Sequence, residues 1–296
     1  MKKLFFIICI LLIAISFVIA QQSEFPKLTG PYFGQKAPVE EPVEFAPGIV
    51  SNGSNASSAA VSPDGKEIYW DVDKIWFTRL ENRKWTKPEM MSFCKEDKSL
   101  YRVPCLSPDG KNLFFLSTRA GSALKDKENI WYSERTSSGW SEPKPINSKV
   151  NALRIHWNIT ISNLGTLFFQ GTRLDGKETG GIYYSTLEKG DYADPVKLGH
   201  EINKPGAITT CPFVAPDESY LIFNSMENSP ENSGIFISFR DKSGNWLPAV
   251  LLVGGSQKEG GLSPRVTPDG KYLFYVNSGM FWMPISKRIK ELRPNK

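Results

Sequence analysis

A short segment that recurs five times constrains the fold of this chain more than any other feature. Its fullest copy is LSPDGKNLFFLS at 106–117, in which an apolar approach, a Ser-Pro-Asp-Gly-Lys corner and a dense apolar run follow one another. Proline and glycine supply the dihedral angles of a tight turn, and the aspartate side chain hydrogen-bonds to the backbone just ahead of it. Two apolar runs joined by such a corner predict a β-hairpin. The other copies are VSPDGKEIYW at 61–70, ISNLGTLFFQ at 161–170, VAPDESYLIFN at 214–224 and VTPDGKYLFYVN at 266–277.

Each copy is followed by further strand-like runs. A third apolar run occurs at 74–80, 129–134, 181–186, 234–239 and 280–285, and a fourth carries an aromatic residue close before a proline, as in Trp85 with Pro88 or Trp140 with Pro143. Proline is tolerated mainly at the edge of a sheet, so the fourth run should be outermost. Each repeat is therefore predicted to be a four-stranded antiparallel meander. Successive corners lie 45 to 55 residues apart, a period typical of β-propeller blades.

The number of strands predicts five blades. The last repeat ends after its third strand, and Val39–Pro42, near the start of the chain, has the spacing of the missing fourth strand with valine in place of tryptophan. If this N-terminal strand completes the last blade, the ring is closed and has no exposed edge. The alternative of six blades would require another hairpin within residues 21–58, where there is no Pro-Asp-Gly corner.

The charge of the chain resides in its two ends. The formal net charge is +5, of which Lys2 and Lys3 contribute two and the tail 287–296 contributes a net four, so the remainder carries a single net negative charge. A basic balance arranged in this way does not predict a nucleic-acid surface. We interpret 287–296 as a solvated basic tail.

The first twenty residues are typical of a secretory signal peptide. Two lysines precede a continuous apolar run that ends in Val18-Ile19-Ala20, which predicts cleavage before Gln21. A retained membrane anchor is the alternative, although the polar residues after Ala20 favour cleavage and no stable membrane insertion thereafter. We therefore expect a periplasmic or extracellular protein with an N-terminal extension at 21–37 and a propeller at 38–286. Export permits disulfides, and the sequence leaves open a Cys94–Cys105 bridge, with Cys211 as a buried thiol.

The corner followed by aromatic residues resembles the WD40-like repeat of TolB-type propellers, and the repeats cover about residues 38–294. More narrowly, GPYFGQKAP, FAPGIVS, CPFVAPD and ISKRIKELRP resemble segments of a group of exported bacterial single-propeller proteins. The resemblance implies the fold but not one function, because relatives of this repeat serve as translocation accessory proteins, docking domains of prolyl peptidases and stand-alone binding modules. The third copy departs from the pattern at Asn163-Leu164-Gly165, so we expect a reshaped corner there.

The sequence carries no complete motif for catalysis by a known nucleophile or for metal binding. His200 begins HEINK, but Lys204 stands where a zinc-protease motif needs its second histidine, and there is no G-x-S-x-G elbow or C-x-x-C pair. We expect no metal and no cofactor. A pair of carboxylates for glycoside chemistry stays open, because the sequence has 31 acids. We interpret the corner residues as structural turns: Asp64, Gly65, Asp109, Gly110, Asp217, Asp269 and Gly270.

Candidate ligand-binding residues lie where loops enter the first strand of each repeat, since these loops gather at one mouth of a propeller channel. The candidates are Tyr101, Arg102, Arg154, His156, Thr209, Thr210 and Arg265. Three arginines from three blades are able to hold an anionic group, whereas the alternative is that they form salt bridges between blades.

We therefore expect an exported, non-enzymatic, monomeric propeller that binds a protein, peptide or glycan through the loops at one mouth of its channel. Two alternatives stay open. One is a hydrolase or lyase that acts on a polysaccharide through carboxylates in the channel. The other is a purely structural component of the envelope.

Overall fold

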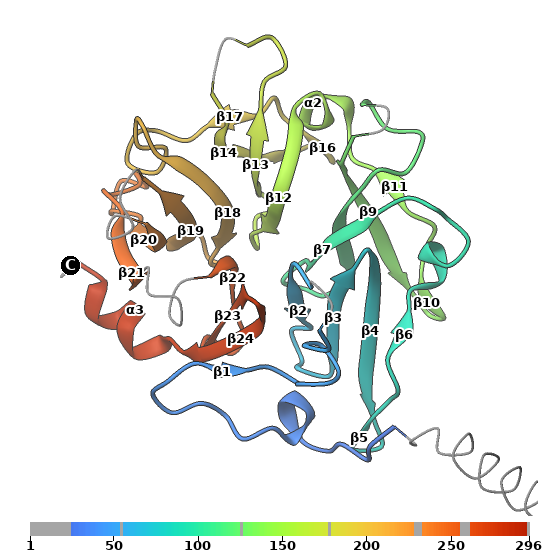
Figure 1. Cartoon of the computed structure of the whole chain (residues 1–296). Helices are drawn as coiled ribbons and strands as arrows, with labels where there is room; N and C mark the ends of the chain where they lie inside the picture. The colour runs from blue at the N-terminus through green and yellow to red at the C-terminus, as the bar shows by residue number, and fades with distance from the viewer. Residues whose placement is uncertain are drawn as a thin grey trace, which may run out of the picture.

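The chain forms a five-bladed β-propeller, as the repeats predict. The structure is a computed structural model, and it describes residues 25–53, 56–124, 127–176, 179–227, 233–254 and 261–294. Five antiparallel sheets are arranged around a central axis, and the strands of each sheet run in order from an inner strand near the axis to an outer edge (Figure 1). The signal peptide predicted at 1–20 lies outside the described residues.

The blades are named here in chain order. Blade 1 contains β2 (Ala59–Val61), β3 (Glu67–Val72), β4 (Lys74–Glu81), β5 (Lys84–Trp85) and β6 (Glu89–Met90). Blade 2 contains β7 (Tyr101–Leu106), β8 (Asn112–Ser117), β9 (Asn129–Thr136), β10 (Gly139–Trp140) and β11 (Lys144–Pro145). Blade 3 contains β12 (Arg154–Ile161), β13 (Leu167–Thr172), β14 (Gly181–Ser185) and β17 (Val196–Lys197), with the ribbon β15 (Leu187–Glu188) and β16 (Asp191–Tyr192) beside them.

The remaining two blades are simpler. Blade 4 contains β18 (Ile208–Val214), β19 (Tyr220–Met226), β20 (Gly234–Phe239) and β21 (Val250–Gly254). Blade 5 contains β22 (Leu262–Val266), β23 (Tyr272–Asn277), β24 (Gly279–Pro284) and β1 (Val43–Glu44). The short helices are η1 (Pro31–Gly34), η2 (Ser92–Cys94), α2 (Ser148–Asn151) and α3 (Ser286–Leu292).

The N-terminal strand closes the ring, which confirms the predicted arrangement. Strand β1 pairs with β24 through Val43 opposite Trp282, and it forms the outer edge of blade 5 (Figure 1). The predicted bounds need a correction, because the paired strand begins just after Pro42 and not at Val39. Proline has no N–H to donate to a ladder. The outer strands β6, β11 and β17 likewise begin directly after a proline.

The N-terminal extension packs over the seam between blades 5 and 1. The ring of Tyr32 lies against those of Phe45, Phe274 and Trp282, with centroids 5.2 to 6.4 Å apart. Trp85 of blade 1 donates from its indole N–H to the carbonyl of Gly30 at 2.8 Å. Burial raises the pKa of Tyr32 to about 12, with nearby Asp269 contributing in the same direction. The closing seam is thus covered by aromatic side chains as well as joined by a strand.

Three of the five corners follow one design. In blades 1, 2 and 5 the hydroxyl before the corner proline donates to the corner aspartate at 2.6 to 2.7 Å, and the glycine adopts a φ near 70°. The same carboxylate accepts a hydrogen bond from the backbone N–H two residues later. The pairs are Ser62 with Asp64, Ser107 with Asp109, and Thr267 with Asp269. The residue types of these corners therefore serve the turn itself.

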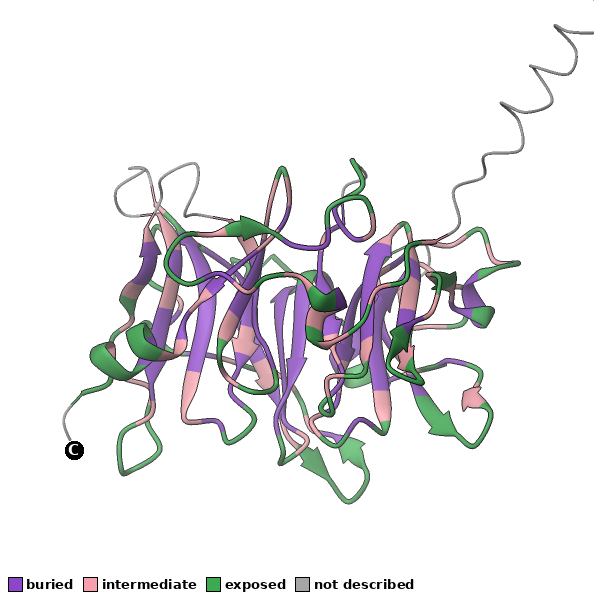
Figure 2. Ribbon diagram, turned by 90° about the horizontal axis from the view of Figure 1, so that it is seen from below, coloured by how far each residue is buried: buried purple, intermediate pink, exposed green. Residues whose placement is uncertain are grey.

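The core lies between the blades, where the faces of neighbouring sheets meet, and exposed residues concentrate in the connections at the two rims (Figure 2). Cys94, Cys105 and Cys211 are free and buried, so the Cys94–Cys105 disulfide that the sequence left open is not formed. The basic tail is not wholly solvated: its first part is helix α3, whose Ile289 is buried in an apolar cluster with residues of blades 4 and 5.

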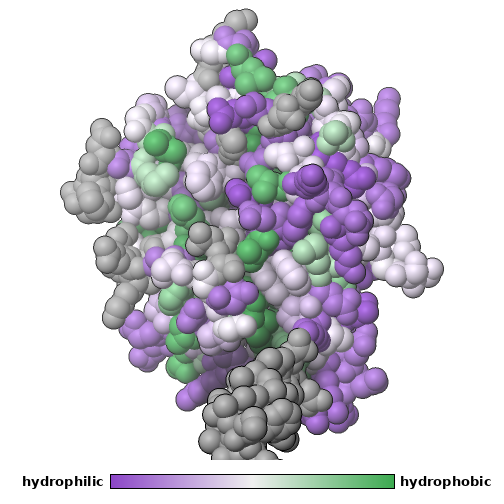
Figure 3. Space-filling model, turned by 45° about the vertical axis from the view of Figure 1, so that its right-hand side comes forward, coloured by the Kyte–Doolittle hydropathy of each residue, from purple (hydrophilic) through white to green (hydrophobic). Residues whose placement is uncertain are grey.

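The surface shows mostly hydrophilic atoms on the right-hand side of the view in Figure 3, and apolar atoms appear in separate areas rather than in one broad patch. The exposed large apolar residues come from several blades. They are Val39, Val43, Trp157, Leu164, Leu174, Leu187, Val196, Ile208, Met226 and Val250.

Candidate binding site in the central channel

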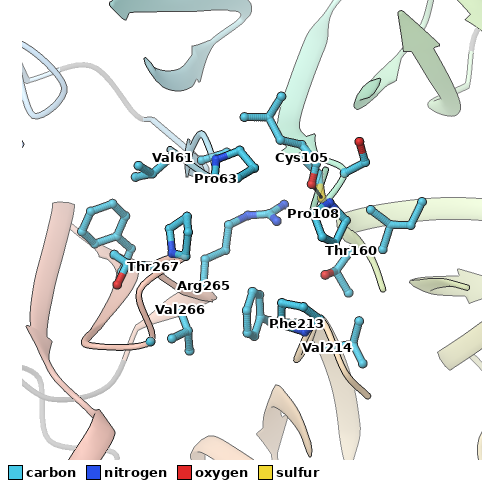
Figure 4. A pocket seen from close by; sticks show the side chains of 18 of the residues that line it. Val61, Pro63, Cys105, Pro108, Thr160, Phe213, Val214, Arg265, Val266 and Thr267 are labelled. Atoms are coloured by element: carbon cyan, nitrogen blue, oxygen red, sulfur yellow. Dashed lines mark hydrogen bonds between the residues drawn. The ribbon is translucent and has the colours of Figure 1, made fainter. Parts of the chain in front are cut away.

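One position of each inner strand faces a common cavity. It is the third residue before the corner proline, or before Asn163 in blade 3, and it lies opposite the same position of the second strand in every blade. Together with the corner residues, these side chains line a cavity of about 290 Å³ at the end of the channel where the corners meet (Figure 4). They are Ala60, Cys105, Thr160, Phe213 and Arg265. Four of the five are small, apolar or neutral, and only Arg265 is charged.

The side chain of Arg265 crosses the channel. Its Nε donates to Ser58 Oγ in blade 1 at 2.8 Å, and its Nη2 donates to Asn158 Oδ1 in blade 3 at 2.6 Å and to the Ile159 carbonyl at 3.0 Å. Only 6% of the residue is exposed. Three blades thus hold one guanidinium in a fixed place, where it points toward the cavity centre in Figure 4.

The guanidinium is buried without a counter-charge. No carboxylate of the described residues lies within 4 Å of it, and none of the residues that line the cavity is acidic. Its Nη1 has no hydrogen bond to any described residue. A buried charge is costly unless it is paired. The arrangement therefore favours an anionic group in the cavity.

The rest of the wall has polar and apolar parts, and Thr160, Asn163 and Tyr220 are among the polar residues that line it. The hydroxyls of Ser107 and Thr267 already donate to the aspartates of their own corners. The ring of Phe213 and the corner prolines Pro63, Pro108, Pro216 and Pro268 supply apolar surface (Figure 4). The cavity thus combines one fixed cation with a mainly hydrocarbon wall.

The structure separates Arg265 from the other predicted ligand residues, which lie toward the opposite ends of the inner strands. Tyr101 is fully buried and donates to Asp97 at 2.6 Å. Arg102 forms an ion pair with Asp73 at 3.3 Å, whereas Arg154 is exposed without an ion pair to any described residue.

The other predicted ligand residues, too, are absent from this cavity. Thr209 and Thr210 are buried, each 4% exposed. The side chain of His156 lies outside the described residues. The predicted grouping of three arginines at one mouth is therefore not what lines this cavity, which takes only Arg265 from that set.

Four inner strands carry a bulge at the same height. The bulged residue is Val103, Trp157, Cys211 or Ser263, each with a φ between 53° and 66°. Such angles are strained for residues other than glycine, most of all for a β-branched residue such as Val103. Trp157 is 52% exposed although its strand is otherwise mainly buried. The inner strand pairs with the second strand on both sides of each bulge.

A second charged group is buried behind the inner strand of blade 1. Asp71 is 1% exposed, its Oδ2 accepts from Ser57 Oγ, and its Oδ1 has no partner among the described residues. Burial raises the pKa of Asp71 to about 6, against the opposing effect of hydrogen bonds from Ser57 and from the backbone of Val103. Its side chain does not line the cavity. Equivalent positions in blades 3 and 4 hold Gln170 and Asn224.

Sequence reasoning identified Arg265 but missed its partners and its surroundings. Ser58 and Asn158 have no motif of their own, so no signal in the sequence marks them. An alignment of the five copies by their corners would have shown arginine alone among alanine, cysteine, threonine and phenylalanine. That contrast is a signal for a site, because repeated units otherwise place similar chemistry at equivalent positions.

Comparison with known proteins identifies the fold. No protein-family model matches the chain, and no curated protein matches its sequence. The endo-arabinase of Bacteroides thetaiotaomicron is 17% identical over 88% of this chain and 98% of that one, with a TM-score of 0.51. TolB of Acinetobacter baumannii is 15% identical over 77% of this chain and 53% of that one, with a TM-score of 0.49. The chain therefore spans about half the length of TolB.

Another similar structure, the nidogen–laminin complex, is 14% identical over 72% of this chain and 70% of that one, with a TM-score of 0.49. At these identities the similarity shows the fold alone. The chain is a five-bladed β-propeller. Within its described residues, no helix has the length and apolar character that crossing a membrane requires.

Proposed function

We propose that this protein is an exported binding module that holds a group of a protein or peptide partner in the cavity where its five corners meet. The observation that carries the proposal is the guanidinium of Arg265, which is 6% exposed, fixed by three blades and without a carboxylate partner among the described residues. Such a group favours a ligand that supplies the missing charge.

The wall supports a protein or peptide over a glycan. A sugar presents many hydroxyls that need partners, and an unpaired polar group in a buried site reduces affinity. In this cavity the hydroxyls of Ser107 and Thr267 are already engaged by the corner aspartates. An apolar side chain, by contrast, finds matching surface on Phe213 and the corner prolines.

Catalysis on a polysaccharide receives no specific support from the arrangement of acids. Among the described residues, the most buried carboxyls are Asp71, which is bonded to Ser57, and Glu218, which is paired with Arg240 and bonded to Ser162. Neither lines the cavity. We therefore propose binding, with turnover as the result that would contradict it.

The test uses the mature chain, residues 21–296, against a displayed peptide library and a glycan array. Ala60→Leu, which fills the cavity, and Phe213→Ala, which removes part of its wall, should each weaken the selected ligands by about tenfold or more. Ala152→Leu makes the same change at an exposed site and should have no effect. Ligands that bind both cavity variants as well as the wild type, with unchanged melting temperatures, would contradict the proposed site. Glycan turnover that Asp71→Asn or Glu218→Gln abolishes would replace it with an enzyme.

We also propose the export pathway and domain limits that the sequence favours, with cleavage before Gln21. Mass spectrometry of the protein recovered from a producing cell should give a chain that starts at Gln21 and is found outside the cytoplasm. A chain that starts at Met1 and stays with the membrane fraction would support the retained anchor instead.

A further inference from the structure

We infer that the ligand of the corner cavity is an apolar carboxylate, that is, one carboxylate attached directly to a hydrocarbon group. This inference rests on the proposed binding function and names the chemistry of its ligand. The cavity is lined by inner-strand positions of all five blades, and Arg265 is the one charged side chain among the described residues that line it.

The unused N–H groups of Arg265 are suited to one anionic group. Nε and Nη2 of Arg265 are engaged by Ser58, Asn158 and the Ile159 carbonyl, so the two N–H groups of Nη1 are those that no described residue accepts. The two N–H groups of Nη1 point in different directions, so one of them donates to an oxygen of a carboxylate, and a charge-assisted bond of this kind is strong. A phosphate would bring more oxygens and more charge than this wall satisfies, since no other cationic side chain of the described residues lines the cavity.

The wall specifies what the carboxylate is attached to. Phe213 and four corner prolines line the cavity, together with the small side chains of Ala60 and Cys105. Burial of hydrocarbon against such a wall contributes free energy in proportion to the area removed from water. A cavity of about 290 Å³ has the capacity for one branched or aromatic side chain with its carboxylate.

Two sources provide this chemistry. One is the C-terminal carboxylate of a polypeptide that ends in an apolar residue, and the other is a free apolar acid. The cavity is partly open to solvent, so the rest of a polypeptide has a way out of it. The two sources differ in whether peptide groups beyond the terminal residue add to affinity.

The central experiment compares ligands and needs no variant. Calorimetric titration of residues 21–296 uses acetylated tripeptides ending in leucine or phenylalanine, each as the free acid and as the amide. A second pair is 4-phenylbutanoate and 4-phenylbutanol. We expect each acid to bind about tenfold or more tightly than its neutral counterpart, because a charged hydrogen bond contributes more than a neutral one. Tighter binding of the tripeptide acids assigns a protein C-terminus, and tighter binding of 4-phenylbutanoate assigns a free acid; either supports the inference.

A variant then attributes the preference to Arg265. Arg265→Gln places an amide near the position of Nε, where Ser58 is bonded, but it loses the bond to Asn158 and removes the charge, so the acid should lose its advantage while the amide keeps its affinity. Arg135→Gln is the matched control, because Arg135 is paired with Glu67 outside the cavity. If Arg265→Gln lowers the melting temperature too far for titration, the comparison of acid and amide on the wild type still decides the question.

Failure of this inference differs from failure of the proposed function. Library peptides that lose binding in Ala60→Leu but bind equally as acid and amide would overturn the carboxylate and leave the binding site standing. Acids that bind with the same advantage in Arg265→Gln would overturn the role of this arginine. The absence of binding by any peptide, acid or glycan would contradict both.

Discussion

The corners of blades 3 and 4 share one hydroxyl–carboxylate pair, whereas each of the other three corners has a pair of its own. In blades 1, 2 and 5 a hydroxyl and an aspartate of the same corner are bonded to each other. Blade 3 keeps the hydroxyl, Ser162, but has Leu164 where the aspartate stands elsewhere. Blade 4 has Ala215 in place of the hydroxyl, and its Glu218 accepts from Ser162 at 2.7 Å.

The bond that is local in three blades therefore joins two blades here. Glu218 occupies the glycine position of its corner with a φ of 56°, and its side chain, which is largely buried, also pairs with Arg240 at 2.8 Å. The backbone N–H of Asn163, which proline lacks at this position in the other blades, donates to the Pro216 carbonyl at 2.8 Å. A buried corner hydroxyl therefore needs a carboxylate as its acceptor. The carboxylate comes from the same corner in three blades and from the neighbouring blade in the case of Ser162.

The largest expected effect is at Glu218, where one carboxylate serves two partners. Glu218→Ala should lower the free energy of unfolding by about 2 kcal/mol, because it leaves the Ser162 hydroxyl and the partly buried Arg240 without their acceptor. Glu218→Gly should lower it less, by about 1 kcal/mol, since glycine adopts a positive φ without strain. Urea denaturation measures both.

Glu134→Ala is the control for this prediction. Glu134 also pairs with a cation, Lys144, but about half of its side chain is exposed. Exposed ion pairs contribute little, so its change should stay within about 0.5 kcal/mol. Equal losses at Glu134 and Glu218 would remove the contrast between the shared corner and an ordinary surface pair.

A second set of equivalent positions sharpens the same comparison. Asp71 in blade 1 stands where blade 4 has Asn224, and burial raises the pKa of Asp71 to about 6. The folded chain therefore holds this proton more tightly than the unfolded chain, so stability from this group is greatest below pH 4 and falls as the pH rises to about 6. Asp71→Asn should raise the free energy of unfolding at pH 7 by about 2 kcal/mol.

Urea denaturation at pH 4.5 and pH 7 tests this expectation. The wild type should lose stability between the two values relative to Asp71→Asn, and Asn224→Asp should introduce a similar loss in blade 4. An unchanged pH dependence in Asp71→Asn would show that the carboxyl of Asp71 is not the group that titrates.

The fold could be predicted from the sequence because the same pattern of strands and corners recurs five times. The Pro-Asp corners, the prolines of the outer strands and the extra strand at the N-terminus together predicted five blades and the closure at Val43–Glu44, with an error of a few residues in that strand. The departure at Asn163-Leu164-Gly165 correctly predicted a reshaped corner, whose ladder closes one residue earlier than in the other blades.

The site was less accessible to sequence reasoning, because it depends on which end of each inner strand a residue occupies. Arg102 and Arg265 both precede a corner, yet only Arg265 is close enough to it to enter the cavity. Its bonds to Ser58 and Asn158 cross the channel between residues more than 100 positions apart. Likewise, the replacement of an aspartate in blade 3 by Glu218 of blade 4 is visible only once the two corners are adjacent.

The replacement of the missing aspartate of blade 3 by Glu218 of blade 4 is open to a direct test, in which a smaller change of stability is expected. Leu164→Asp places a carboxylate where the regular corners have one. In the wild type it should lower stability by about 0.5 kcal/mol, because it adds a negative charge beside Glu218; in Glu218→Ala it should raise stability by about 1 kcal/mol, because Ser162 regains an acceptor. A double-mutant cycle measures the difference, and effects of the same sign in both backgrounds would contradict the exchange of one carboxylate for the other.

The smallest expected effect concerns a regular corner. The hydroxyl of Ser107 donates to Asp109, and this bond, helped by the backbone N–H of Lys111, holds the pKa of Asp109 below its ordinary value. A lowered pKa means that the carboxylate stabilises the fold above the pKa of the unfolded chain, and that this contribution is lost as the pH falls through the folded value. Asp109→Ala should therefore lower the free energy of unfolding by about 0.5–1 kcal/mol at pH 7 and by almost nothing near pH 2.

NMR titration of the carboxyl provides the sharper measurement. Ser107→Ala should raise the pKa of Asp109 toward that of an isolated aspartate, whereas Ser138→Ala, at an exposed turn of the same blade, should leave it unchanged. A pKa that ignores Ser107 would mean that the aspartate is kept for its turn geometry alone, and the hydroxyl–carboxylate pair would no longer be the common element of the five corners.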